Sequence, residues 1–416
     1  MKRVFISDMH IGDGFLCDNF LFDDELETLL FDLLDSSEET ELIIVGDGLE
    51  LMESRMVKDL GLLPFDELIN TVDPSVINDI FNNHRSVFNA LRKFCRVHKL
   101  TYIIGNHDYY FHTQNCFQER FKELIGSSEN VKFVPYLYDR DWGLFAIHGN
   151  NFDVGNSFGI DKKTGKLIPP IGDYMARYMM INFKEVLING DVPDHIPHDY
   201  DDVRPNMDIF DWFSVMMKTY DMGINLVELW MEELLKMLKT VQAKQWMQSK
   251  YPFAHKFANL FINSNRGVNF GRKLVGIVSK IRSLKKTNYM KKKAENVLMK
   301  APMNPEKYGF QESDFYGYCQ KPDIDYDNLK GIIFAHRHKF ENLILPCNGY
   351  NKFYINTGTW RNVIEKEVNS KKNKFVKRAE LAYVMIDEHD GELSISSVMH
   401  NKIKNKSFIT TGNEVI

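Results

Sequence analysis

The sequence has few cysteines and no long apolar segment, and both absences restrict what the protein can be. Only five of the 416 residues are cysteine, and none of them has CxxC spacing. We therefore expect neither a disulfide scaffold nor a zinc-thiolate site, and we expect a reducing compartment, the cytoplasm. No run of about 18 apolar residues occurs, so a membrane-spanning helix is not expected either.

Length and composition point to a folded protein of more than one part. The apolar stretch at the N-terminus is too short for a secretory signal, because Asp8 and His10 follow it directly. Hydrophobic residues make up 44% of the chain and charged residues 26%, which are usual values for a globular protein. At about 100–200 residues per domain, this length indicates two or three domains, or one domain with a large insertion.

Strand-like and helical patterns alternate in the first part of the chain. Short β-rich runs occupy 4–6, 42–45, 102–104 and 144–147, while helical periodicity marks 24–34 and 77–98. Strand-like runs return at 331–334, 353–355, 381–386 and 393–398, with a turn at Asp390-Gly391 between the last two. This alternation predicts a layered α/β fold.

The middle of the chain has a different pattern. Residues 156–329 are rich in Met, Trp and Phe at helical spacing, with one stripe from Leu226 to Val241 and another from 274 to 284. We therefore predict a first core part at 1–155, a mainly helical basic insertion at 156–329, and a second core part at 330–416.

Five polar clusters follow strand-like runs, where α/β proteins commonly bind ligands. They are Asp8-Met9-His10, Gly46-Asp47, Gly105-Asn106-His107-Asp108, His148-Gly149 and His336-Arg337-His338. In an extended chain, residues i and i+2 point to the same side, so Asp8 and His10 can face one point, as can His336 and His338.

The donor types indicate metal binding. Carboxylate, imidazole and amide donors without thiolate suit Mn²⁺ first, with Fe or Zn as alternatives. Seven candidate ligands are too many for one ion, but two ions about 3.5–4 Å apart that share a carboxylate would use them all. The seven are Asp8, His10, Asp47, Asn106, His148, His336 and His338.

These motifs, in this order, resemble the calcineurin-like metallophosphoesterase superfamily over about residues 1–155 and 330–400. The resemblance implies a four-layer α/β/β/α sandwich of two mixed sheets. It assigns Asp8, His10 and His338 to one metal, and Asn106, His148 and His336 to the other, with Asp47 bridging. One departure is Ala335, which stands where the family usually has glycine.

The resemblance also implies a reaction. A metal-bridging hydroxide would attack phosphorus in line, His107 would stabilise or protonate the leaving group, and Asp108 would orient His107. The expected function is hydrolysis of a phosphate ester or pyrophosphate on a lipid-linked or nucleotide substrate. The alternatives are a nuclease or cyclic-nucleotide phosphodiesterase on the same centre, and an inactive binding scaffold.

Three further features lie near these motifs, and the sequence allows more than one role for most of them. Glu50 and Arg55 could border the pocket or could serve as capping or surface residues. Arg337 could reach a phosphate or face solvent. The segment Asn356-Thr357-Gly358-Thr359-Trp360 follows a strand, and we assign it a supporting role beside the site.

Charge is distributed unevenly along the chain. Residues 236–300 contain sixteen Lys and Arg and one acid, a charge of +15, while the remainder carries −20. A basic amphipathic segment indicates peripheral contact with an anionic membrane, contact with nucleic acid, or pairing with the acidic core. The opening Asp8–Asp13 and Gly46–Glu50 are also similar to the UDP-diacylglucosamine pyrophosphatase-like branch, whose substrate is a lipid-linked pyrophosphate.

Overall fold

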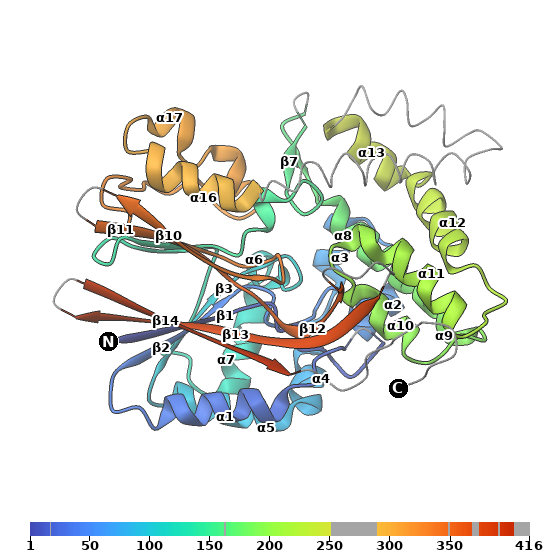
Figure 1. Ribbon diagram of the computed structural model, residues 1–416, viewed down its shortest axis with the longest axis horizontal. Helices are drawn as coiled ribbons and strands as arrows, with labels where there is room; N and C mark the ends of the chain where they lie inside the picture. The colour runs from blue at the N-terminus through green and yellow to red at the C-terminus, as the bar shows by residue number, and fades with distance from the viewer. Residues whose placement is uncertain are drawn as a thin grey trace. The chain divides into compact units, whose positions relative to one another are not determined.

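The chain divides into two compact units in this computed structural model (Figure 1). The structure describes residues 1–402 except 17, 162–163, 251–288, 348–349, 368–373 and 390–391. The first unit comprises Met1–Phe158, Asn288–Arg361 and Glu380–His400, and the second comprises Gly159–Thr287 and Asn362–Ala379 with the C-terminal residues. The class is mixed α/β with two mixed sheets, as expected for the coarse fold.

The first sheet has the strand order β12-β13-β1-β2-β3-β4, and β14 pairs with β13. Its central strands are parallel, and β1 runs antiparallel to β13. The strands are β1 (Lys2–Ile6), β2 (Thr40–Val45), β3 (Lys99–Ile103), β4 (Val131–Val134), β12 (Trp360–Lys366), β13 (Phe375–His389) and β14 (Glu392–Lys402). The runs expected at 4–6, 42–45, 102–104, 381–386 and 393–398 therefore fall on or overlap strands, while the turn expected at 390–391 lies outside the described residues.

The second sheet has the order β10-β11-β9-β6-β5. Strands β6, β9 and β11 are parallel, and β5 and β10 each pair antiparallel with a neighbour. The strands are β5 (Leu137–Asp139), β6 (Leu144–Ala146), β9 (Gly331–Phe334), β10 (Phe340–Cys347) and β11 (Tyr350–Thr357). A further two-stranded ribbon is formed by β7 (Gly159–Ile160) and β8 (Leu167–Ile168).

One apolar core joins the inner faces of the two sheets. Phe5 and Ile43 of the first sheet cluster with Leu144, Ile333 and Ile355 of the second, and all five are fully buried. On the far side of the second sheet, α16 (Tyr289–Lys300) contributes Val297 and Leu298 to a second cluster. This burial is the main stabilising contribution to the first unit.

Helices cover the other face of the first sheet. Figure 1 shows α1 (Asp23–Leu34), α5 (Arg85–Cys95) and α7 (Asn115–Ile125) along that face. Leu26 and Leu30 of α1 and Leu91 of α5 line the same small apolar space as Leu42 and Ile44 of β2. The periodicity expected at 77–98 corresponds to two helices, α4 (Val76–Asn83) and α5, because His84 between them leaves the helical conformation.

The first unit also contains several short helices. They are α2 (Arg55–Leu60), α3 (Phe65–Thr71), α6 (Tyr110–Thr113) and α17 (Pro305–Tyr308), together with the 3₁₀ turns Asn150–Phe152 and Glu312–Phe315. The four described cysteines form no disulfide. Among the described residues, no helix is both long and apolar enough to cross a membrane.

The second unit is mainly helical in its described part. It contains α8 (Ile171–Met179), a π-helical turn (Met180–Lys184), α9 (Glu185–Asn189), α10 (Ile196–Asp199), α11 (Ile209–Thr219), α12 (Leu226–Leu238) and α13 (Val241–Lys250). The stripe expected from Leu226 to Val241 is wrong at its end, because a helix break after Leu238 leaves Val241 66% exposed. Within this unit, the Lys366 ammonium of β12 pairs with the Asp208 carboxylate at 3.2 Å.

The longest segment of the second unit ends earlier in the chain than the expected insertion does. Its central segment is Gly159–Thr287, whereas the insertion was expected to extend to residue 329. The physical reason is that α16 and the residues after it pack against the second sheet through Val297, Phe310 and Phe315. The stripe expected at 274–284 lies outside the described residues.

A buried histidine joins three segments of the first unit. The His84 ring is 2.8 Å from Asp23 at Nδ1 and 3.0 Å from Asp18 at Nε2, with the Asn83 amide and the Phe20 ring also against it. Asp18 also accepts hydrogen bonds from the backbone N–H groups of Gly14 and Phe20. Burial alone would lower the pKa of His84, but the Asp18 and Asp23 carboxylates raise it above its usual value.

We expect this histidine to make stability depend on pH. Because the folded state raises the pKa of His84, its contribution is complete below the ordinary value of 6.5 and is lost as pH rises through the folded value. His84→Gln should therefore lower the free energy of unfolding by about 2–3 kcal/mol near pH 5.5, and by less near pH 9. Denaturant unfolding at both pH values measures this, with the exposed His389→Gln as control. If His84→Gln lowers the free energy of unfolding by the same amount at both pH values, His84 does not cause the pH dependence.

Candidate metal centre

The structure brings the polar clusters together at the ends of strands from both sheets. Asp8 follows β1, Asp47 follows β2 and Asn106 follows β3, and these three strands are parallel neighbours. His148 follows β6 and His336 follows β9, which are also parallel neighbours. Three groups of side chains within this region have their donor atoms within 4.8 Å of one another.

An unusual backbone conformation turns these side chains toward one another. Six described non-glycine residues have positive φ, and five of them are expected metal ligands: Asp8 (49°), His10 (50°), Asp47 (51°), His336 (69°) and His338 (52°). Such residues cost of order 1–3 kcal/mol each and concentrate at functional sites. The strain therefore marks the same residues that the motifs identify.

The first group contains Asp8, His10 and His338. The Nε2 atoms of His10 and His338 are 3.2 Å apart, and Nε2 of His338 is 3.3 Å from Oδ1 of Asp8. Apart from this approach of His338, Oδ1 of Asp8 is buried without a hydrogen bond among the described residues, whereas Oδ2 accepts from the Ser7 hydroxyl and from the backbone N–H of His336. A cation among these three atoms would satisfy this buried oxygen.

The second group contains Asp47, His148 and His336. Oδ2 of Asp47 is 3.1 Å from Nε2 of His148 and 3.7 Å from Nε2 of His10, so it lies between the two groups. Burial alone would raise the pKa of Asp47, but His148 and His107 hold it well below its usual range. The Asp47 carboxylate is therefore ionised, and its Oδ2 faces a histidine from each of the two groups.

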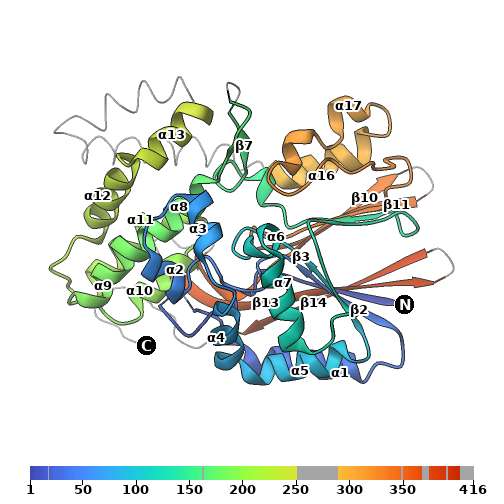
Figure 2. The same ribbon diagram turned by 180° about the vertical axis from the view of Figure 1, so that it is seen from behind.

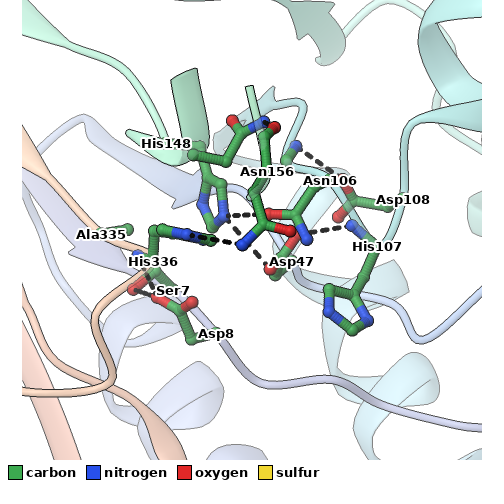
Figure 3. Close-up of polar contacts among 12 residues, drawn as sticks. Ser7, Asp8, Asp47, Asn106, His107, Asp108, His148, Asn156, Ala335 and His336 are labelled. Atoms are coloured by element: carbon green, nitrogen blue, oxygen red, sulfur yellow. Dashed lines mark hydrogen bonds and ion pairs between the residues drawn. The ribbon is translucent and has the colours of Figure 1, made fainter. Parts of the chain in front are cut away.

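The hydrogen bonds of His148 fix which ring nitrogen faces this centre (Figure 3). Nδ1 lies 2.8 Å from the Val45 carbonyl, which can only accept, so Nδ1 carries the proton. Nε2 then faces two oxygens, Oδ2 of Asp47 and Oδ1 of Asn106 at 3.2 Å. Burial would lower the pKa of His148, but Asp47 raises it to about 9, so this position attracts a proton or, in competition with it, a metal ion.

Two residues that the motifs did not indicate face His336. Nε2 of His336 is 3.4 Å from the Asp153 carboxylate and 3.4 Å from the Asn156 amide. Asp153 also accepts from the backbone N–H of Gly155 and from the Asn156 amide. This loop follows His148 by only a few residues, but the sequence contained no motif that marked it.

Two glycines allow the loops to approach closely. Gly46 has φ of 82°, and a Cβ there would lie 2.4 Å from Nδ1 of His148. A Cβ on Gly105 would lie 2.2 Å from Oδ1 of Asp47. A larger residue at position 46 or 105 would therefore clash with a side chain of the centre, so glycine is needed there for space as well as for the turn.

The structure assigns Asp108 a different role from the expected one. Among the described residues, its carboxylate accepts from the backbone N–H of Gly48 (2.9 Å), the backbone N–H of Gly105 (2.6 Å) and the Tyr102 hydroxyl (2.6 Å). None of these contacts is to the His107 ring, so the expectation that Asp108 orients His107 is not met. Asp108 instead ties the loops after β2 and β3 together, and burial with the Asp47 charge raises its pKa to about 7.

Glu50 takes the place expected for Asp108. It is buried, and its carboxylate lies 2.8 Å from Nδ1 of His107 and 2.8 Å from Nδ1 of His10. Burial alone would lower the pKa of His107, but Glu50 and Asp47 raise it to about 10, so this ring is cationic near neutral pH. The same carboxylate holds Nδ1 of His10, so Nε2 of His10 faces the first group, and metal-binding histidines are commonly oriented by a carboxylate in this way.

The segment Asn356–Trp360, which spans the end of β11 and the start of β12, contacts the loops of the site. The Thr359 hydroxyl (2.8 Å) and the Trp360 backbone N–H (3.2 Å) donate to the backbone carbonyl of Asp8. The Asn356 amide donates to the carbonyl of Ala335 at 2.7 Å. Arg337 pairs with Glu341, and the backbone N–H of Arg55 donates to Asp13. These contacts hold the loops that carry Asp8 and His336.

The donor set of the centre fits divalent cations. The described residues form buried His and Asp clusters that could hold a metal ion, and Asn106 adds an amide oxygen beside His148. Imidazole and carboxylate donors without sulfur suit Mn²⁺, Fe²⁺ and Zn²⁺. Comparison with protein-family models and with curated proteins finds no match to this chain.

We expect Asp47 to control metal content. Asp47→Asn keeps the size of the side chain but removes the shared negative charge, so both cations should bind more weakly. Elemental analysis after dialysis should give well under two metals per chain for the variant, and about two for wild type, as a shared-carboxylate site requires. The exposed Asp141→Asn variant is the control. Two metals retained in Asp47→Asn would contradict the bridging assignment.

Proposed function

We propose that the protein is a phosphoesterase of the calcineurin-like metallophosphoesterase superfamily that uses two divalent cations. The observation that carries the proposal is the position of Asp47, whose Oδ2 faces His148 from one donor group and His10 from the other. The fold supports it, since helices lie outside two sheets that share one core, which is compatible with a four-layer sandwich. Mn²⁺ is the proposed metal.

The residues divide into two proposed ligand sets. Asp8, His10 and His338 would hold one cation, and Asn106, His148 and His336 the other, with Asp47 common to both. When bound, such a pair supplies activation of water and neutralisation of charge on a phosphoryl group. Two further polar groups of the centre are Glu50 and His107, whose carboxylate and ring lie in contact.

His107 is the proposed proton donor to the leaving oxygen. Glu50 holds Nδ1, which leaves Nε2 for a substrate, and the raised pKa of His107 keeps the ring protonated near neutral pH. A cationic donor stabilises charge that develops on a leaving oxygen, and it does so most where the leaving group is a poor one. Glu50 is a positioning residue in this scheme, because it acts through His107.

A substrate panel tests the proposal. Bis-p-nitrophenyl phosphate, p-nitrophenyl phosphate, a UDP-linked lipid and single-stranded DNA would each be assayed with added Mn²⁺ and after chelation. We expect Mn²⁺-dependent hydrolysis of at least one phosphodiester or pyrophosphate, and loss of that activity in Asp47→Asn. Preference for DNA or a cyclic nucleotide would favour the nuclease or phosphodiesterase alternative. Full metal loading without hydrolysis of any substrate would favour an inactive scaffold.

We expect His107→Ala to separate catalysis from metal binding. Metal content should stay at the wild-type level, while kcat should fall by about 10²–10³-fold, the usual cost of one preorganised transition-state group. The loss should be large for an alkyl phosphodiester and small for p-nitrophenyl esters, whose leaving group needs no proton. The exposed His389→Ala variant is the control. Unchanged kcat for both substrates would remove His107 from the reaction.

The basic segment remains a separate hypothesis. Contact of residues 236–300 with an anionic membrane, and the weaker nucleic-acid alternative, stay predictions, because 251–288 lie outside the described residues. The two described helices at the ends of the segment belong to different units. Helix α13 is part of the second unit, whereas α16 packs in the core of the first unit through Val297 and Leu298.

A further inference from the structure

An open hollow lies in the helical layer of the first unit, away from the residues of the metal centre. It has a volume of about 370 Å³ and is formed by α4, α5 and α7. These helices lie beside one another in both Figure 1 and Figure 2. The polar residues that line it are Asn78, Asn82, Arg85, Asn89, Arg92 and Arg120.

Neutral groups hold the arginine side chains of this hollow. Nε of Arg92 donates to the Leu124 carbonyl at 2.6 Å, and its Nη1 donates to the Asn89 amide oxygen at 2.7 Å. Nε of Arg120 donates to the Asn78 amide oxygen at 2.8 Å. The contact of Arg85 with Asn82 is long, at 3.4 Å. Carbonyl and amide oxygens orient a guanidinium group without neutralising its charge.

The hollow therefore has an excess of positive charge. Among the residues that the structure describes, neither Arg85 nor Arg92 forms an ion pair with a carboxylate, and only Arg120 does so, with Glu123 at 2.5 Å. Three arginines thus line one hollow, and among the described residues one of them, Arg120, is paired with an acid. Like charges brought together in this way repel, and an anion between them would remove the repulsion.

We propose that this arginine hollow binds a phosphate group, either as free phosphate or carried by a small molecule. Guanidinium groups present paired N–H donors that match phosphate oxygens, and the three asparagine amides can donate to any oxygen that remains. The volume lies at the lower end of small-molecule sites, which is enough for a phosphate with a modest organic part. Phe81 and Leu124 supply an apolar wall for that part.

This site is independent of the metal centre and of the proposed catalytic function. Its residues come from α4, α5 and α7, whereas the metal ligands lie in loops after β1, β2, β3, β6 and β9. Binding to the hollow can therefore be measured on chelated protein, in which the metal centre cannot bind phosphate through metal ions. Failure of one proposal leaves the other standing.

Calorimetric titration of the chelated full chain tests the proposal. Inorganic phosphate and adenosine monophosphate would be titrated separately in a constant chloride background. We expect one site per chain. The double variant Arg85→Gln/Arg92→Gln should weaken binding at least about tenfold, which is about 1.4 kcal/mol. The matched control is Arg96→Gln, an exposed arginine at the end of α5 that does not line the hollow, and it should bind as wild type does.

The comparison of ligands and variants makes the outcome decisive. Tighter binding of the nucleotide would show that the organic part occupies the hollow, and equal binding would assign the site to phosphate alone. Because Arg92 also ties α5 to α7, the single variant Arg85→Gln, at an exposed position, guards against loss of folding, and its thermal midpoint should match wild type. Absence of binding to wild type at millimolar concentrations, or equal binding by wild type and both variants, would overturn the proposal.

Discussion

The Asp47 carboxylate is the constraint around which the first unit is organised. It is buried, ionised and close to imidazoles from different strands, with Oδ2 3.1 Å from His148 and 3.7 Å from His10. A buried carboxylate is costly unless cations or hydrogen bonds offset its charge. The facing histidines and the His107 backbone N–H at 2.9 Å serve that requirement, and Gly46 and Gly105 leave the space that these close contacts need.

Backbone strain is concentrated at the same place. Asp8, His10, Asp47, His336 and His338 all adopt the left-handed conformation that side chains rarely take. Hydrogen bonds hold the loops that carry them, including those from the Thr359 hydroxyl to the Asp8 carbonyl and from the backbone N–H groups of Gly48 and Gly105 to the Asp108 carboxylate. A fold that retains this strain keeps a set of donors aimed at one region, which is what a preorganised metal site requires.

The strand ends and most of the centre could be predicted from sequence, because a polar cluster after each apolar run is a local signal. The sequence does not decide between a pocket and a surface role for Glu50, since nothing local says that its carboxylate contacts both His10 and His107. Asp108 was given the wrong contact for the same reason, as its partners Tyr102 and Gly48 are set by tertiary packing. Likewise, periodicity gave one helix at 77–98, but the contacts of His84 with Asp18 and Asp23 interrupt it.

The most direct test is to locate the metal ions themselves. Crystals grown with Mn²⁺ would be measured at the manganese absorption edge, and an anomalous difference map would be calculated. We expect two peaks about 3.5–4 Å apart, the usual separation in two-metal sites, with Asp47 between them. One peak should lie beside Asp8, His10 and His338, and the other beside Asn106, His148 and His336. A single peak, or two peaks that do not share Asp47, would contradict this expectation.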